Sequence, residues 1–328
     1  AIRHSPSPIP MKILIIAPNL SGAITGNRIT ATRWKHLLQT LGHTVILKET
    51  YEGERLDLLV ALHATKCYPS LKRFKKENPE KPIVIGLAGT DLYQDLPSQP
   101  ITREALRWAH AVVALQPLAR EALPPSIARK TVVIYQSAVP PQKRLKPLRR
   151  CFEICLVANL RDVKDPFLAE EASRLLPARS RIRITHIGSA YASFWEKEAR
   201  KRARTNKHYV WLGPQKHSRT LQLMDRARLV LLTSKSEGGA NVVSEALACG
   251  KPLLCSEISG SVGILGKDYP GYFPPGDHEA LAQLMLKAET EEGFLQALQR
   301  AIEKKRPLVD PGRERRAWKS LLKRLFAP

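Results

Sequence analysis

The stretch that decides the fold is Leu229–Ser256, LVLLTSKSEGGANVVSEALACGKPLLCS. It contains a short apolar run, a glycine-rich turn, an apolar segment of helical length that stops at Gly250, and a second apolar run. Short apolar runs that alternate with helical segments are typical of parallel strands joined by crossover helices. The stretch therefore predicts one strand–helix–strand unit of a parallel sheet.

The same alternation extends along the chain from Met11 and predicts an α/β protein with two Rossmann-like parallel sheets. Ligands of such sheets bind outside the carboxyl ends of the strands, so we expect a site in a cleft that the two domains face. The expected organisation is a tag remnant or loose arm at 1–10, an N-terminal domain at 11–140, a linker at 141–150, a C-terminal domain at 151–310, and a C-terminal helix at 311–328 that could return to the first domain.

Twelve apolar runs are predicted to be strands, and the helices between them carry apolar stripes. Trp34 and Trp318 lie on two such stripes, which favours core packing for both rings. The expected strands are Lys12–Pro18, Thr44–Lys48, Asp57–His63, Ile83–Ala88, Ala111–Gln116 and Thr131–Gln136 in the first half, and Phe152–Ala158, Ile182–Ile187, Tyr209–Leu212, Leu229–Thr233, Leu253–Cys255 and Tyr272–Phe273 in the second.

Composition narrows the class of protein and its partners. No run approaches the length of a membrane span and no secretory leader precedes Met11, so we expect a cytoplasmic protein. Five cysteines without metal-ligand spacing are expected to be reduced thiols. The net charge of +23 favours anionic partners: nucleic acid, an anionic membrane surface or phosphorylated small molecules. Specific nucleic-acid binding is disfavoured because neither a groove-reading motif nor an aromatic stacking platform accompanies the charge.

Two glutamates, Glu237 and Glu245, flank the glycine-rich turn and the start of the following helix. The small residues Gly238, Gly239 and Ala240 leave room for a ligand to approach backbone N–H groups at a helix amino end. Glu237 could accept hydrogen bonds from sugar hydroxyls, and Glu245, two turns into the helix, from both hydroxyls of a ribose.

This segment resembles the E-x7-E motif of the retaining GT-B glycosyltransferases of the family-4 type. The resemblance covers the chain after Met11 and implies a nucleotide-sugar-binding C-terminal domain and an acceptor-side N-terminal domain. It implies that Arg161 and Lys164, just after the first strand of the second domain, bind the donor diphosphate, with Gly22 behind it. The segments 186–189 and 211–213 correspond to loops on the nucleotide side.

A more specific resemblance is to the selenosugar synthase (SenB-type) branch of these transferases. It rests on GNR at 26–28, ALHA at 61–64, GTDLY at 89–93, IYQSA at 134–138, VKDPF at 163–167, EGGANV at 237–242 and DYPGYFP at 268–274. The resemblance implies C–Se bond formation between selenophosphate and the sugar of a UDP-sugar, of the UDP-GlcNAc or UDP-glucose type, for selenoneine biosynthesis. Gly239-Ala240-Asn241 departs from ordinary family-4 sequences, and Asn241 adds an amide near the sugar or the nucleophile.

These arguments define three sets of candidate residues. A departing diphosphate needs preorganised positive groups, and an arginine with a lysine could replace a divalent metal, so we expect neither a metal nor a further cofactor. Asp91 and Asp95 are the nearest carboxylates, and we interpret them as a loop cap and a surface residue. The catalytic set is Arg161, Lys164, Glu237 and Asn241; the donor-binding set is Gly22, Gly188, Gly238, Gly239, Ala240, Val242 and Glu245; the acceptor-binding set is Asn27, Arg28, His63, Lys66, Thr90 and Gln136.

Two alternatives remain open at this point. One is a retaining transferase that acts on a sugar or lipid hydroxyl, for which the positive charge would favour an anionic membrane surface. The other is a non-catalytic protein that binds a nucleotide sugar or nucleic acid. The presence of all four of Arg161, Lys164, Glu237 and Glu245 argues against the second.

Overall fold

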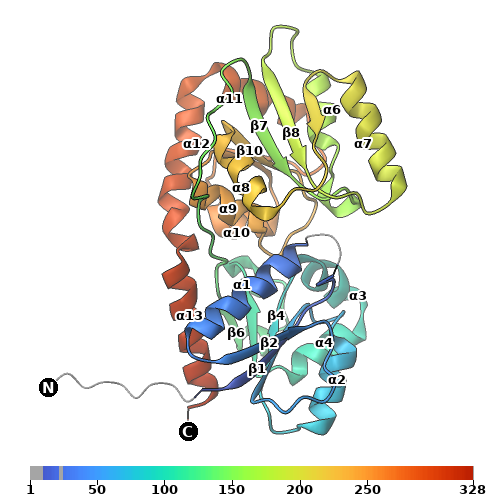
Figure 1. Cartoon of the computed structure of the whole chain (residues 1–328), viewed down its shortest axis with the longest axis vertical. Helices are drawn as coiled ribbons and strands as arrows, with labels where there is room; N and C mark the ends of the chain where they lie inside the picture. Colours follow the sequence, from blue (N-terminus) through green and yellow to red (C-terminus); the bar gives the residue numbers. More distant parts are fainter. Residues whose placement is uncertain (1–9, 22–24, 328) are drawn as a thin grey trace, which may run out of the picture. The chain divides into compact units, whose positions relative to one another are not determined.

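The computed structural model describes residues 10–21 and 25–327, and the chain folds into two compact units. Unit 1 consists of Ala1–Leu115, Arg120–Ile134 and Glu314–Pro328, and unit 2 of Gln116–Ala119 and Tyr135–Arg313. Each unit contains one six-stranded sheet in which all described pairings are parallel (Figure 1). The predicted fold class of two Rossmann-like parallel sheets is therefore confirmed. In the described part of the chain, no helix has the length and apolar character that crossing a membrane requires.

The sheet of unit 1 has the strand order β2-β1-β3-β4-β5-β6. Its strands are apolar on both faces because helices cover both. The strand order changes direction between β1 and β3, and ligands of open parallel sheets bind at such a switch point. The strands are β1 Lys12–Ile16, β2 Thr44–Lys48, β3 Leu58–Leu62, β4 Ile83–Gly86, β5 Ala111–Ala114 and β6 Thr131–Val133.

Two helices far apart in the sequence, α1 and α13, pack on the same side of this sheet (Figure 1). The indole rings of Trp34 and Trp318 lie edge to face with centroids 4.9 Å apart, and both are fully buried. Core packing was predicted for both rings and is confirmed. The helices of unit 1 are α1 Gly26–Thr40, α2 Tyr68–Glu77, the π-helical turn η1 Asp91–Asp95, α3 Leu96–Ser98, α4 Pro100–Trp108, α5 Pro125–Ala128 and α13 Pro311–Leu325. The first three residues of α13 belong to unit 2, because the last segment of unit 1 begins at Glu314.

The buried Glu314 joins these two helices. Its carboxylate accepts hydrogen bonds from Arg33 Nε at 3.1 Å and from Trp34 Nε1 at 3.1 Å. A carboxylate that is 2% exposed needs such donors because an unpaired buried charge is costly. Glu314 therefore fixes the rotation of α13 and leaves the opposite face of the helix to solvent.

The sheet of unit 2 has the strand order β12-β11-β10-β7-β8-β9, which changes direction between β7 and β10. Its strands are β7 Phe152–Val157, β8 Ile182–Ile187, β9 Tyr209–Trp211, β10 Leu229–Leu232, β11 Leu253–Ser256 and β12 Tyr272–Phe273. Its helices are η2 Pro117–Arg120 at the border with unit 1, η3 Asp162–Lys164, α6 Leu168–Arg174, α7 Ser193–Thr205, α8 His217–Arg226, α9 Asn241–Cys249, α10 Ser259–Leu265, α11 His278–Thr290, α12 Glu292–Lys305 and η4 Arg306–Val309.

Most of the observed strands end one to three residues before the predicted run does. The last residues of these runs belong to the loop at the carboxyl end of the strand. The largest difference is in the sixth run, where β6 ends at Val133 and Gln136 lies beyond the strand. Gln136 belongs to unit 2, and residues 141–150 form neither helix nor strand.

Candidate functional site

The loops that follow β7 and β8 are held together at the carboxyl edge of the sheet in unit 2. Leu160 N donates to Ser189 O at 2.8 Å, and Ser189 N donates to Asn159 Oδ1 at 2.9 Å. Gly188 lies so close to the first loop that a β-carbon there would be 1.9 Å from Ala158 O. A glycine is required at this position by close backbone approach, so the predicted donor residue Gly188 has a structural role in placing the loop that carries Arg161.

Lys164 and Glu237 meet at the point where the strand order of unit 2 changes direction. The ammonium group of Lys164 forms an ion pair with Glu237 Oε1, which also accepts a hydrogen bond from Ser234 Oγ at 2.8 Å. Their side chains are only 20% and 15% exposed, so this charge pair is partly shielded from water. The structure thus brings together two residues of the predicted catalytic set that are 73 positions apart.

Two hydrogen bonds to backbone carbonyls of this loop anchor it to the end of β10. Thr233 Oγ1 donates to Lys164 O at 2.9 Å, and Lys235 N donates to Val163 O at 2.9 Å. Asp165 closes the short helix η3 with φ of 44°, a left-handed conformation that reverses the chain. The ammonium group of Lys164 is therefore presented by a fixed backbone.

Arg161 precedes η3, and its guanidinium lies over the ring of Tyr191 at 5.5 Å from the centroid. Its Nε is buried and has no hydrogen-bond partner among the described residues. Buried polar groups in proteins are nearly always paired, so an unpaired guanidinium nitrogen at a ligand-binding edge suggests an anionic ligand. Tyr191, which is 46% exposed, was missed by the sequence analysis because nothing in its spacing indicates a contact with Arg161.

The glycine-rich turn leads into the amino end of α9. Ala240 occupies the cap position and contributes no side-chain hydrogen bond. Gly239 O accepts a hydrogen bond from Gln136 Nε2 at 2.5 Å. The predicted residues Gly238, Gly239, Ala240, Asn241 and Val242 are thus consecutive at a helix amino end, a position that favours anions.

Gln136 was placed in the acceptor-binding set as a residue at the end of a strand. The structure buries it, with 3% of its surface exposed, and directs its amide to the turn before α9. The observed contact positions the turn of unit 2. Its expected role as a ligand contact therefore stays a prediction.

Glu245 is buried in α9, with 5% of its surface exposed, and Glu245 Oε1 lies 2.8 Å from His217 Nε2. His217 begins α8, in the connection after β9. The sequence analysis did not single it out, although a histidine at the start of a helix after a strand end was a usable signal. Its contact engages one carboxylate oxygen of Glu245.

In unit 1, the loops after β3 and β4 are joined by the buried carboxylate of Asp91. Asp91 accepts hydrogen bonds from Ala64 N at 2.8 Å and Ala88 N at 2.7 Å, as expected of a loop cap. Burial raises the pKa of Asp91 to about 7. Asp95, expected at the surface, has a side chain that is only 18% exposed and lies 4.0 Å from His63, because η1 turns it inward.

His63 lies beneath this pair of loops with φ of 90°, an unusual conformation for a residue with a β-carbon. Lys66 N donates to His63 Nδ1 at 3.3 Å, so Nε2 carries the ring proton and donates to Thr90 Oγ1 at 2.8 Å. Burial, together with the charge of Lys66, lowers the pKa of His63 to about 4. The ring is therefore neutral at physiological pH and orients the Thr90 hydroxyl.

The remaining predicted residues are placed as follows. Asn27 and Arg28 lie half-buried in the first turn of α1, where Arg28 N donates to Thr25 Oγ1 at 3.1 Å. Lys66 is exposed next to His63. Gly22 lies outside the described residues. Among the residues that are described, no group of three His, Cys, Asp or Glu side chains is arranged to hold a metal ion.

Comparisons with known proteins identify the family of the second half of the chain. The family model for glycosyl transferases group 1 matches residues 142–306, which is half of the chain and includes the loops of Arg161, Lys164 and Glu237. Over 88 residues, the chain is 31% identical to the Bacillus subtilis protein named as the putative teichuronic acid biosynthesis glycosyltransferase TuaC, a match that covers 27% of this chain and only 23% of that protein.

Solved structures support the same fold over nearly the whole chain. HepE of Anabaena, solved with UDP and glucose, is 18% identical with a TM-score of 0.76 and covers 96% of this chain and 100% of its own. Sucrose-phosphate synthase of Thermosynechococcus elongatus is 13% identical with a TM-score of 0.77, covering 96% and 99%. At these identities the likeness shows the fold alone, which is that of GT-B glycosyltransferases. From the family match and the fold together, we conclude that this chain belongs to the group 1 family of glycosyl transferases.

Proposed function

We propose that this chain transfers the sugar of a UDP-sugar, of the UDP-GlcNAc or UDP-glucose type, to selenophosphate and releases UDP. The observation that carries the proposal is the buried, unpartnered Nε of Arg161 beside Lys164 at the switch point of the sheet in unit 2. A nucleoside diphosphate needs such paired positive groups when it departs. HepE, which shares the fold, was solved with UDP-glucose, and this supports the choice of donor.

Cleavage of the bond between the anomeric carbon and the diphosphate builds negative charge on the departing oxygens. Preorganised cations stabilise this charge best in a site from which water is largely excluded. Arg161 offers a planar fork for two phosphate oxygens, and Lys164 offers a point charge whose position is fixed by Glu237. The amino end of α9 adds the positive end of a helix dipole.

The two glutamates orient the rest of the donor. One oxygen of Glu237 is held by Lys164 and Ser234, which leaves its second oxygen to accept hydrogen bonds from sugar hydroxyls. Glu245, fixed by His217, accepts from the ribose. Asn241, the first residue of α9, places an amide near the sugar.

Selenophosphate is an anionic nucleophile and needs no protein base to remove a proton. Its selenium attacks the anomeric carbon, the C–Se bond forms as the bond from that carbon to the UDP oxygen breaks, and the electron pair leaves with UDP. Hydrolysis of the Se–P bond then gives the selenosugar and phosphate, which would supply selenoneine biosynthesis. The Thr90 hydroxyl accepts a hydrogen bond from His63, so its own proton points elsewhere and donates to an oxygen of the acceptor. Asn27, Arg28 and Lys66 complete the acceptor-binding set.

The test is to incubate the protein with selenophosphate and either UDP-GlcNAc or UDP-glucose, with and without a chelator. Mass spectrometry should detect the isotope pattern of selenium on the sugar. An Arg161→Gln variant should lose the product, whereas a Lys197→Gln variant, changed at an exposed cation of α7, should retain it. UDP release with a sugar alcohol and none with selenophosphate would exclude the proposal.

A second candidate is transfer to a sugar or lipid hydroxyl. The partial identity to TuaC, named for teichuronic acid biosynthesis, favours it. This candidate predicts UDP release that depends on a hydroxyl acceptor and is unaffected by selenophosphate. The same assay, run with both acceptor classes, distinguishes the two.

A further inference from the structure

The solvent-facing side of α13 in unit 1 carries a concentration of positive charge. Helix α13 buries Trp318, Leu321 and Leu322 against the sheet, which fixes the direction of its other face. In the described part of the chain, no carboxylate forms an ion pair with any cation of that face. These exposed cations are Arg315, Arg316, Lys319, Lys323 and Arg324.

The basic helix α7 in unit 2 provides a contrast. Its arginines are largely neutralised: Arg200 pairs with Glu196, and Arg202 pairs with Glu170, Glu171 and Glu198. In α13 the one acidic residue, Glu314, points inward to Arg33 and Trp34. The outer face of α13 therefore keeps its full charge, whereas much of the charge on α7 is balanced.

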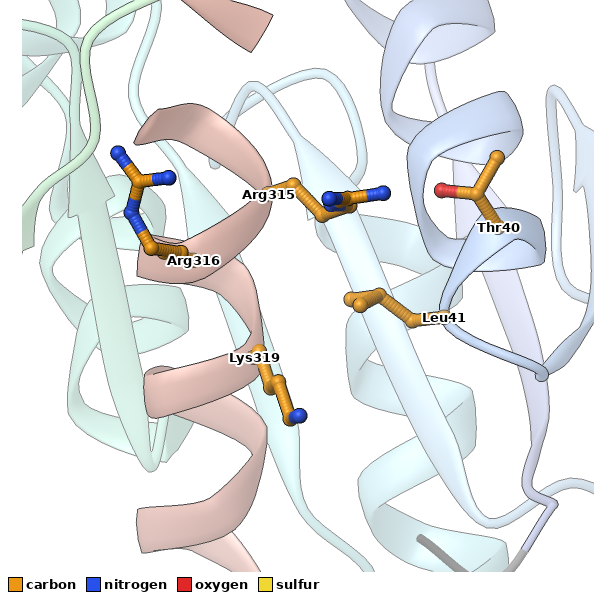
Figure 2. Close-up of a pocket in the computed structure, with 5 residues that line it drawn as sticks. All are labelled: Thr40, Leu41, Arg315, Arg316 and Lys319. Carbon is orange, nitrogen blue, oxygen red and sulfur yellow. The ribbon is translucent and has the colours of Figure 1, made fainter. Parts of the chain in front are cut away.

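Part of this face is hollowed. A cavity of about 210 Å³ lies between α13 and the end of α1, lined by Thr40, Leu41, Arg315, Arg316 and Lys319 (Figure 2). Figure 2 shows the Arg315 side chain extending from α13 towards Thr40, while Arg316 extends on the other side of the helix. Since Thr40 Oγ1 already donates to Leu37 O, the donors available to an anion in this cavity are the cationic side chains.

We propose that the outer face of α13, with this cavity, binds the anionic surface of a phospholipid bilayer. The unbalanced charge complements anionic headgroups, and the cavity can receive a lipid phosphate between Arg315 and Lys319. Phe326, 41% exposed one residue beyond α13, supplies an apolar group for the interface.

A bilayer fits this face better than a nucleic acid does. Phe326 is the one exposed aromatic residue on the described part of α13 and its end, and single-stranded nucleic acids bind to platforms of several aromatic rings. A charged surface that presents several lysines and arginines around one apolar anchor matches a membrane interface.

The test is flotation with vesicles of phosphatidylcholine alone and vesicles in which about one third of the lipid is phosphatidylglycerol. The wild-type chain should bind only the anionic vesicles, and raising the salt to about 1 M should release it. Neutralising Arg315, Arg316 and Lys319 together with glutamine should reduce partitioning on the order of 100-fold, since each cation near the surface contributes about a factor of five. Phe326→Ala should weaken binding further.

The matched control neutralises Lys197, Lys201 and Arg204 on α7 with glutamine, which gives the same net charge. This variant should bind like the wild type. Equal losses in the two triple variants would assign binding to net charge and overturn the proposal, as would absence of binding to anionic vesicles or preferential binding to single-stranded nucleic acid. Melting curves confirm that each variant is folded, and UDP release is measured separately because the changed residues lie outside the donor site.

Discussion

Gly260 provides a way to displace Glu237 without substituting Glu237 itself. Gly260 lies in the first turn of α10, and a β-carbon there would be 2.2 Å from Glu237 O and 2.9 Å from its carbonyl carbon. Contacts of this kind below 3.0 Å are essentially never seen, so the Gly260→Ala change must move one backbone segment by at least the difference, 0.8 Å. Because the clash joins the start of α10 to the turn carrying Glu237, we expect this turn to move.

A displacement of about 1 Å in a positioning group can cost on the order of 100-fold in rate. Overpacking costs about 1–3 kcal/mol, and the better helix propensity of alanine offsets about 1 kcal/mol of this. The net loss of about 0–2 kcal/mol corresponds to a decrease in Tm of less than about 8 °C for a domain of this size. Gly260→Ala should therefore remain folded while kcat falls.

The assay measures UDP release under saturating substrates and the melting temperature of the same preparation. Gly293→Ala is the control, because nothing lies within 4 Å of its new β-carbon and the residue is exposed in α12. The control should keep the wild-type rate. A folded Gly260→Ala protein with wild-type kcat would show that the position of Glu237 does not matter for turnover, and the reasoning about this turn would be wrong.

Four further predictions address the site and the fold. Lys164→Met should lower kcat by about 100-fold or more, because it removes the proposed phosphate ligand and leaves Glu237 without its counter-ion; steady-state kinetics measure this. Thr90→Val should raise KM for selenophosphate about 10-fold, whereas Thr90→Ser should not, because one hydrogen bond to an anion is lost only in the first. Burial lowers the pKa of His186 to about 4, so as the pH falls below 6.5 this histidine is protonated in the unfolded chain before it is protonated in the folded one. His186 should therefore lower the free energy of unfolding by about 2 kcal/mol at about pH 5. His186→Gln should remove this contribution to the pH dependence in urea titrations. Glu314→Ala should destabilise unit 1 by about 3 kcal/mol, measured by calorimetry, because it leaves buried donors unpaired.

Each of these has an outcome that contradicts it. Unchanged turnover in Lys164→Met removes the lysine from the leaving-group role. Equal KM values for the valine and serine variants of Thr90 would mean that the hydroxyl makes no substrate contact. A His186→Gln protein that keeps the pH dependence of the wild type would assign the titration to other groups, and an unchanged transition in Glu314→Ala would mean that α13 is held by its apolar face alone.

The strands were the most predictable feature because a strand buried on both faces has to be apolar along its whole length. The runs at Thr44–Lys48 and Ile182–Ile187 match β2 and β8 to the residue. The ends of other runs were overestimated, as beyond β6, since the residues that follow a strand in a carboxyl-edge loop are often apolar too, here Ile134 and Tyr135. Local pattern also indicated the glycine turn before α9 and the core positions of both tryptophans.

The sequence by itself determined the order of apolar strands and amphipathic helices, and with it the two parallel sheets and the edge at which we propose that ligands bind. These features depend on neighbours within a few residues. The tertiary structure alone decided which partners meet across long separations: Lys164 with Glu237, His217 with Glu245, and Glu314 with Trp34. A sequence lists the charges and hydrogen-bonding groups of a chain, but burial and distance determine which of them pair, and both are set only when the strands take their places in the sheet.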